Sequence, residues 1–149
     1  MNKIKFIAFG SDHAGYIYKE FIKKKFYKNY NIIDFGSFSE KKVDYTDYIH
    51  PTASYINNKK NDNYLGIIFC GTGNGAAITA NKYINIRAAI LWNESIAILA
   101  KKHNNANIIS IPSRFLKKNE VLNIINIFLE EKFEGGRHEN RIKKIKNLY

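Results

Sequence analysis

The only cysteine of the chain, Cys70, stands between an apolar run and the glycine-rich turn Gly71-Thr72-Gly73-Asn74-Gly75, and a helical pattern begins directly after this turn. The order predicts a thiol at the carboxyl end of a strand, beside backbone N–H groups at a helix N-terminus. Such N–H groups bind anions and stabilise a thiolate, and successive N–H groups can hold a developing oxyanion. With the histidines and arginines elsewhere in the chain, the segment is typical of an enzyme acting on a small phosphorylated molecule.

Other interpretations of this segment stay open. Gly71, Gly73 and Ala76 match the loose dinucleotide fingerprint G-x-G-x-x-G/A, and Glu94 lies where a ribose-binding acid belongs. The turn follows the third predicted strand rather than the first, which disfavours nicotinamide binding. No Gly-Lys-Ser/Thr follows to make a Walker loop, and Ala76 stands where a tyrosine phosphatase needs an arginine. A free cysteine is also often a buried core residue. A metal site is disfavoured because neither a second cysteine nor a close histidine pair supplies ligands.

Two pairs of polar residues are candidates for contact with a sugar or a phosphate. Asp12 and His13 lie in the turn Gly10–Gly15, where Asp12 could instead only cap the next helix. His103 closes a predicted helix, a place where a cation suits the helix dipole, and Asn104 follows as a plausible C-terminal stop.

Arg137, His138 and Arg141 form the clearest cationic cluster of the sequence. Residues three and four apart share one face of a helix, and guanidinium groups match phosphate oxygens bidentately. The lysines that follow also fit an ordinary basic terminal helix, so both interpretations stay open.

Composition and length set wider limits. The 149 residues fit one domain spanning 1–149, and the chain has no apolar run of ~18 residues to cross a membrane. One cysteine and no signal-peptide pattern predict a cytoplasmic protein. The net charge of +11 fits nucleic acid, an anionic membrane or a phosphate substrate, but it also fits a lysine-rich composition throughout. The basic and aromatic segment Lys23–Tyr30 is interpreted as an amphipathic helix end with aromatic residues inward and lysines solvated.

Short apolar runs alternate with longer helical patterns. The predicted strands are Ile4–Phe9, Asn31–Asp34, Gly66–Phe69, Arg87–Leu91 and Asn107–Ser110. The predicted helices are Gly15–Tyr27, Tyr45–Asn58, Gly75–Lys82, Ser95–Lys102, Asn119–Glu131 and Arg137–Leu148, with Pro51 expected in or just before a first turn. Strands rich in Ile and Phe without polar alternation are buried on both faces. We therefore expect an α/β fold: a five-stranded parallel, Rossmann-like sheet in a three-layer α/β/α sandwich, with an extra C-terminal helix.

Ligands of such sheets bind beyond the carboxyl ends of the strands. Asp12 and His13 follow the first predicted strand, Cys70 follows the third and Arg114 follows the fifth. These residues are therefore expected to share one crevice.

Taken together, the motifs resemble the ribose/galactose isomerase family, type B ribose-5-phosphate isomerases in particular. The matching segments occur in family order and cover nearly the whole chain: Gly10-Ser11-Asp12-His13-Ala14-Gly15, Asp44-Tyr45, Cys70-Gly71-Thr72-Gly73, Ala80-Asn81-Lys82, Ile86-Arg87-Ala88, His103-Asn104, and Glu134-Gly135-Gly136-Arg137-His138 followed by Arg141.

The resemblance implies interconversion of ribose 5-phosphate and ribulose 5-phosphate without a metal or an organic cofactor. It also implies a homodimer or a dimer of dimers with sites between subunits, to which the partner chain supplies His103, Asn104, Arg137 and Arg141. The expected roles are ring opening by His103, proton abstraction by Cys70, proton movement by Thr72, an anion hole at Gly71, Gly73, Asn74 and Gly75, sugar positioning by Asp12 and Tyr45, and phosphate binding by His13, Arg114, Arg137, His138 and Arg141.

Two features depart from the family pattern: Asn74 stands where the family usually has a small apolar residue, and Gly75-Ala76-Ala77 lacks the serine often seen there. Some relatives use a glutamate at position 75 as base and lack the cysteine; Gly75 stands there in this chain, which leaves Cys70 as the only credible base. An allose- or galactose-6-phosphate isomerase is the nearest alternative, because a longer pocket cannot be measured from sequence. A basic nucleic-acid-binding module is the non-enzymatic alternative, although neither nucleic acid nor a membrane is the expected partner.

Overall fold

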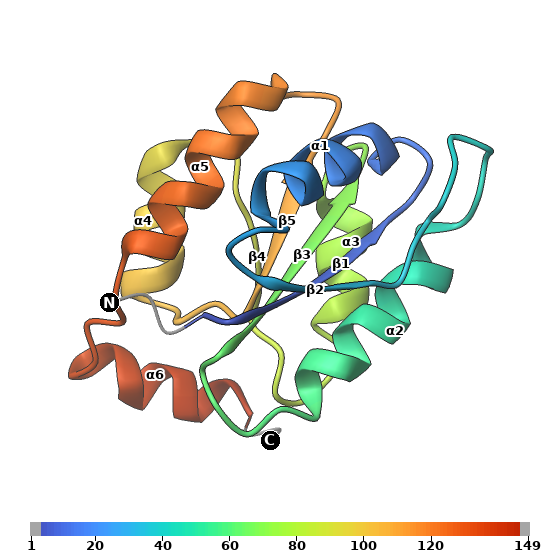
Figure 1. The fold of residues 1–149 in the computed structure, drawn as a ribbon. Coiled ribbons are helices and arrows are strands. Elements are labelled where there is room, and N and C mark those ends of the chain that lie inside the picture. Colours follow the sequence, from blue (N-terminus) through green and yellow to red (C-terminus); the bar gives the residue numbers. More distant parts are fainter. Residues whose placement is uncertain (1–3, 147–149) are drawn as a thin grey trace.

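A computed structural model describes residues 4–146 of the chain. Its centre is one parallel five-stranded sheet in the order β2-β1-β3-β5-β4 (Figure 1). The strands are β1 (Phe6–Ser11), β2 (Asn31–Asp34), β3 (Tyr64–Cys70), β4 (Ala88–Ile90) and β5 (Ile108–Pro112). The predicted parallel, Rossmann-like sheet is confirmed.

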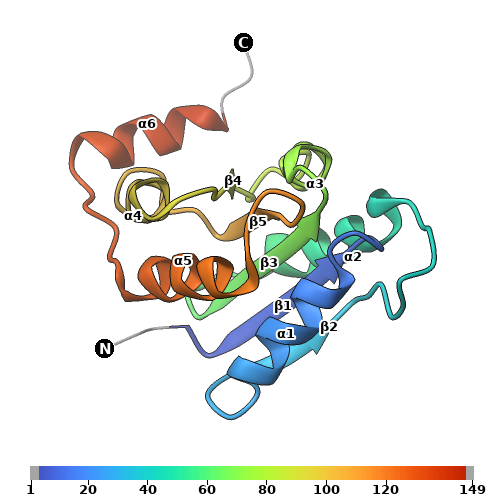
Figure 2. The same cartoon turned by 90° about the horizontal axis from the view of Figure 1, so that it is seen from above.

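Helices cover both faces of the sheet. They are α1 (Tyr16–Phe26), α2 (Tyr45–Asn57), α3 (Asn74–Ala80), α4 (Glu94–Lys102), α5 (Lys118–Glu130) and α6 (Arg137–Ile145). Figure 2 shows α1, α4 and α5 on one side and α2 and α3 on the other, which makes three layers. Helix α6 lies outside these layers, beside the end of α4 (Figure 2).

The near-continuous apolar runs are explained by two cores, one on each face of the sheet. Ile67 and Phe69 of β3 pack with α1, α4 and α5, whereas Ile68 and Cys70 pack with α2 and α3. Successive side chains of a strand point to opposite faces. A strand buried on both faces therefore needs apolar residues at every position.

Most predicted boundaries differ from the structure by one or two residues. Strand β3 continues through Cys70, one residue beyond the predicted bound, so the thiol lies at the carboxyl end of the strand as predicted. The expectation for Pro51 was wrong, because Pro51 lies inside α2. The last two residues of the helix predicted to end at Leu148 lie outside the described range. Between residues 4 and 146, no helix combines the length and the apolar character needed to cross a bilayer.

Candidate active site

From β1 the chain continues to β2 on one side, and from β3 it continues to β4 and β5 on the other side, so the topological switch point lies between β1 and β3. The turns that follow these two strands meet there. The N–H of Asp12 donates to the carbonyl of Phe69 at 3.2 Å. Open parallel sheets bind ligands in the crevice outside such a switch point. The predicted convergence of Asp12 and Cys70 at one edge of the sheet therefore matches the observed topology.

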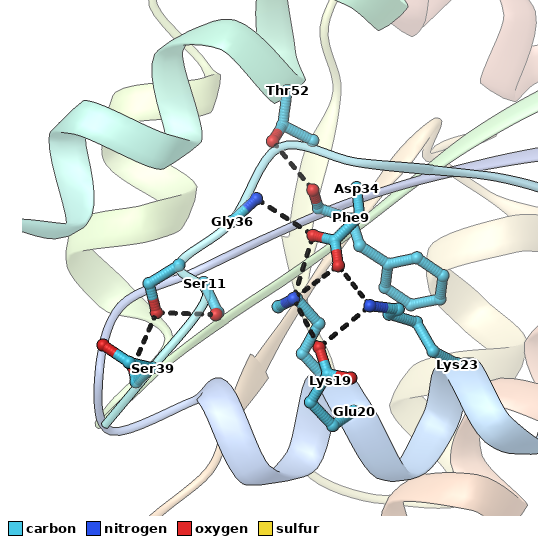
Figure 3. A network of polar contacts seen from close by, with 10 residues as sticks. Phe9, Ser11, Lys19, Glu20, Lys23, Asp34, Gly36, Ser39 and Thr52 are labelled. Carbon is cyan, nitrogen blue, oxygen red and sulfur yellow. Dashed lines mark hydrogen bonds and ion pairs between the residues drawn. The ribbon is translucent and has the colours of Figure 1, made fainter. Parts of the chain in front are cut away.

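A buried ion pair holds the segment after β2 against the turn that follows β1. The Asp34 carboxylate accepts hydrogen bonds from Nζ of the fully buried Lys19 at 2.6 Å and from the N–H of Gly36 at 2.9 Å (Figure 3). The Gly36 carbonyl in turn accepts from the N–H of Ser11 at 2.6 Å, and the N–H of Ser37 donates to the Ser11 carbonyl at 2.8 Å. The residue before Asp12 is thus fixed on both sides by backbone bonds.

Lys23 and Glu20 complete this network (Figure 3). Burial alone would raise the pKa of Asp34, but hydrogen bonds from Lys19 and Lys23 outweigh it, so the pKa lies below the usual value of a carboxyl group. The prediction that Lys23 is solvated was wrong, because its ammonium group binds both carboxylates.

The glycine turn surrounds the thiol with backbone groups. Cys70 is buried at 4% exposure, and its Sγ accepts a hydrogen bond from the N–H of Gly73 at 3.2 Å. Gly73 has a φ of +77°, a conformation that favours glycine, and its carbonyl accepts from Oγ of Ser110 at 2.7 Å. The N–H of Asn74 donates to Oγ1 of the exposed Thr72 at 3.2 Å. The turn is therefore a fixed cradle of N–H groups directly beside the sulfur.

Tyr45, at the start of α2, lies against the same turn. A Cβ built on Gly75 would stand 2.6 Å from Cζ and 2.9 Å from the hydroxyl oxygen of Tyr45. Any side chain at position 75 would collide with this ring. The close approach brings a phenol to the rim of the turn, and a methyl group at position 75 would require this ring to shift.

Arg114 supplies a cation at this edge. Its N–H donates to the carbonyl of Gly71 at 3.1 Å, and its Nη1 lies 3.1 Å from where a Cβ on Gly71 would stand. Its guanidinium group therefore lies over the turn, where it can bind an anionic group.

Asp12 and His13 are held by the surrounding backbone. Oδ1 of the buried Asp12 accepts from the N–H of Gly15 at 2.9 Å, within the turn that precedes α1, whose N-cap is Gly15 itself. Nδ1 of the half-buried His13 lies 3.2 Å from both the N and the carbonyl O of Val43. We define the carboxyl-edge group as Asp12, His13, Tyr45, the segment 70–75 and Arg114.

The remaining predicted site residues form a second cluster, the amino-edge group, which consists of His103, Asn104, Arg137, His138 and Arg141. The rings of His103 and the buried His138 are stacked, with centroids 4.1 Å apart and planes 10° from parallel. Nε2 of each ring lies 3.9 Å from a carboxylate oxygen of Glu134. Sequence reasoning assigned no role to Glu134, and its place four residues before His138 was the available signal.

The two groups lie at opposite edges of the sheet. Cys70 ends β3, whereas His103 ends α4, which runs back past the sheet to the beginning of β5. Figure 1 shows α6 beyond the amino ends of the strands, away from the turn between β3 and α3. One chain therefore does not bring Cys70 and His103 together.

The prediction that no close histidine pair exists was wrong. Within residues 4–146, one group of potential metal ligands, His103, Glu134 and His138, has its ligand atoms within 4.8 Å of one another. A metal lies in the plane of each imidazole that binds it, and two nearly parallel stacked rings do not direct their lone pairs at one point. Nε of Arg137 also approaches Nε2 of His138 at 3.4 Å. Burial lowers the pKa of His138, and its neighbours His103 and Arg137 lower it further. The stacked ring geometry is therefore unsuited to binding one metal ion through both histidines.

Comparison with known proteins gives a consistent result. A family model described as "Ribose/Galactose Isomerase" matches residues 7–145. The chain is 39% identical over 141 residues to a probable ribose-5-phosphate isomerase B of Mycoplasma genitalium, covering 93% of this chain and 92% of the relative. It is 35% identical over 143 residues to the ribose-5-phosphate isomerase B of Escherichia coli, covering 95% of each chain.

Solved structures agree with this result. A crystal structure of the Thermotoga maritima ribose 5-phosphate isomerase has a TM-score of 0.90 and 42% identity, covering 95% of this chain and 97% of that one. A crystal structure of the Mycoplasma genitalium ribose-5-phosphate isomerase B with bound ribulose-5-phosphate has a TM-score of 0.90 and 38% identity, covering 96% and 95% of the two chains.

Proposed function

Because the chain belongs to the ribose/galactose isomerase family, we propose that it is an aldose–ketose isomerase that interconverts ribose 5-phosphate and ribulose 5-phosphate through an enediolate. The fold it shares with a relative holding bound ribulose-5-phosphate supports the substrate. The single observation that carries the chemistry is the hydrogen bond from the Gly73 N–H to the Cys70 sulfur at 3.2 Å.

Cys70 acts as the general base. The N–H of Gly73 donates to the Cys70 sulfur, which fixes where Sγ stands when it takes up the proton. Gly75 has no side chain, so no group at position 75 competes for the role of base. The thiolate removes the proton from C2 of the open aldose, so the C2–H bond breaks and an S–H bond forms. The thiol then delivers a proton to C1, which gives the ketose.

The negative charge that develops on O1 is held by the N–H groups of the turn 71–75. Donors fixed before the reaction starts stabilise such a charge strongly, because they need no reorganisation as it forms. Thr72 moves the proton between O2 and O1. Its oxygen already accepts from the N–H of Asn74, which leaves its own hydroxyl proton free for the substrate.

A second chain completes the site. The resemblance implies ring opening by His103, which lies at the edge of the sheet opposite to Cys70 of the same chain. In a symmetric dimer each chain can give its amino-edge group to the carboxyl-edge group of its partner, which produces two equal sites. His13, Arg114, Arg137, His138 and Arg141 then bind the phosphate, while Asp12, Tyr45 and Asn104 contact the sugar. Binding of the remote phosphate supplies energy that orients C1 and C2. A homodimer or a dimer of dimers in the cytoplasm belongs to this proposal.

The test is a metal-free assay of ribulose 5-phosphate formation from ribose 5-phosphate with the parent protein and with Cys70→Ala. Circular dichroism and thermal unfolding serve as the control for folding. Activity of the parent and a loss of about 10²–10⁴-fold in a folded variant are expected for removal of a general base. Activity in both proteins would retain the isomerase and reject Cys70 as its base. A parent protein that does not act on ribose 5-phosphate but isomerises allose or galactose 6-phosphate would show that the substrate has six carbons.

A further inference from the structure

Arg87 connects the start of β4 to the end of α4. Its Nε donates to the carbonyl oxygens of Asn104 at 3.1 Å and Asn105 at 3.0 Å, and its Nη2 donates to the Asn105 oxygen at 2.8 Å. Both carbonyls belong to the turn directly after His103. One planar guanidinium group thus binds two successive peptide groups beside the proposed ring-opening residue.

The turn that Arg87 binds needs external support. Asn105 has a φ of +42°, a backbone conformation that residues other than glycine adopt infrequently. Nζ of Lys101 also donates to Oδ1 of Asn105 at 2.9 Å. A cation at the C-terminus of a helix interacts favourably with the dipole. Arg87 therefore fixes the conformation in which the chain leaves α4.

Arg87 is itself held firmly. Its N–H donates to Oδ1 of Asn107 at 2.8 Å, and Nδ2 of Asn107 donates to the Asn85 carbonyl at 2.8 Å. The next residue, Ala88, exchanges hydrogen bonds with the side chain of Asn81 at 2.8 and 3.0 Å. Two segments that resemble the family pattern, Ala80-Asn81-Lys82 and Ile86-Arg87-Ala88, are thus joined by hydrogen bonds, and these bonds fix the backbone of Arg87.

We propose that Arg87 is a positioning residue that sets where His103 and Asn104 extend from α4 into the site completed by the partner subunit. The inference rests on the proposed function. The ring stack of His103 on His138 restrains only the imidazole, whereas Arg87 fixes the backbone on which it stands. Without Arg87 the imidazole is displaced from the ring oxygen of the furanose, while Cys70 and its turn are untouched.

This division of roles is testable because the two substrates need different steps. Ribose 5-phosphate must open its furanose ring before C2 is accessible. Ribulose 5-phosphate is acyclic, because the phosphate on O5 prevents O5 from closing a ring on C2. Exchange of its C1 proton with D₂O therefore requires the base and the anion hole but no ring opening. A residue that positions His103 affects the first reaction and spares the second.

The experiment compares the parent, Arg87→Gln and Arg87→Lys in both reactions. Arg87→Gln is expected to lower kcat for ribose 5-phosphate about 10–100-fold, because displacements of about 1 Å cost up to about 10²-fold. Its C1 exchange rate should change less than about threefold. Arg87→Lys should fall between parent and Gln variant in kcat, since an ammonium group cannot bind two carbonyls in the planar fork. If the Gln variant does not fold, the Lys variant carries the same comparison.

Lys102→Gln is the matched control, since it removes one positive charge from the same helix end without touching the carbonyls, and it should retain parental rates. Equal losses in both reactions would reduce Arg87 to a general structural residue and overturn the proposal. Unchanged kcat in folded Arg87→Gln would also overturn it. A parent inactive in both reactions would instead reject the proposed function and this inference with it.

Discussion

At the carboxyl edge, Cys70 ends β3, and Gly73 and Asp12 lie in turns that are hydrogen-bonded to β3. At the amino edge, His103 and His138 meet through their rings on two helices. The first arrangement is fixed by the sheet itself, and the second depends on side-chain packing. The proposed proton transfer, which tolerates little displacement, thus uses the more rigid of the two edges.

The two groups also differ in how closely the glycines beside them are packed against the rest of the protein. Gly75 is packed so closely that a Cβ would meet Tyr45, whereas within the described residues nothing lies within 4 Å of a Cβ built on Gly135 or Gly136. These two glycines precede α6 and both have positive φ. The segment that carries Arg137 and His138 is therefore joined to the core by an open connection, and contacts such as the histidine stack determine its place.

The largest expected effect tests whether the two edges belong to one site. Cys70→Ala and His103→Gln should each lose about 10²–10⁴-fold in kcat for ribose 5-phosphate. After co-refolding in equal amounts, half of the dimers are mixed and each has one intact site, so activity should return to about a quarter of the parental value. Separately refolded samples mixed at the end serve as the control. No recovery in verified mixed dimers would place both residues in the site of one chain.

Removal of Asp34 tests the rigidity of the carboxyl edge. Asp34→Ala leaves the fully buried Lys19 without its closest carboxylate, and such a loss typically costs about 3–5 kcal/mol of unfolding free energy. Because the pKa of Asp34 is lowered on folding, its contribution is fully present above about pH 3.9, the usual pKa of aspartate. It is lost as the pH falls through the lowered folded value. Urea unfolding should therefore show a smaller difference between parent and variant at pH 3 than at pH 7. An equal difference at both would contradict the assigned ion pair.

Gly75→Ala tests how much displacement of the glycine turn 71–75 the reaction tolerates. The added methyl group collides with the ring of Tyr45, so either the ring or the turn must shift, and kcat/KM is expected to fall about 10²-fold. In a Tyr45→Ala background the methyl group has space, so the further loss should be smaller. Steady-state kinetics of the four proteins in a double-mutant cycle measure this coupling. Additive losses would show that the contact does not set the turn.

The smallest effect is expected on α6. Glu139 and Lys143 form an ion pair at 3.0 Å with side chains 54% and 69% exposed. Glu139→Gln should change the unfolding free energy by about 0.5 kcal/mol or less, because exposed pairs are screened by water and salt. Chemical unfolding of Glu139→Gln and Asp34→Ala under the same conditions compares the two losses of unfolding free energy directly. A loss as large as that of the buried pair would show that α6 is as firmly held as the core.

Sequence patterns predicted the sheet, the helices and the carboxyl edge well, because strands buried on both faces leave a continuous apolar signal. Strand β3 and the turn after Cys70 followed from that signal and from glycine chemistry. The burial of Lys19 could not be predicted in this way, because a lysine in a helical pattern is usually solvated. Only the packing of α1 beside β2 brings Asp34 next to it. The stack of His103 on His138 joins residues 35 positions apart in the numbering through side chains alone. The contact of Tyr45 with Gly75 likewise depends on how α2 packs, which no local pattern encodes.

The placement of the two groups on opposite edges has a consequence for how the protein responds to dilution. If a working site needs both edges from different chains, catalysis is subject to mass action between copies. Specific activity then declines once the protein concentration falls below the dissociation constant of the dimer. Under the same condition, substrate would bind only where two chains meet, so it would draw the chains back together and protect the enzyme at low abundance.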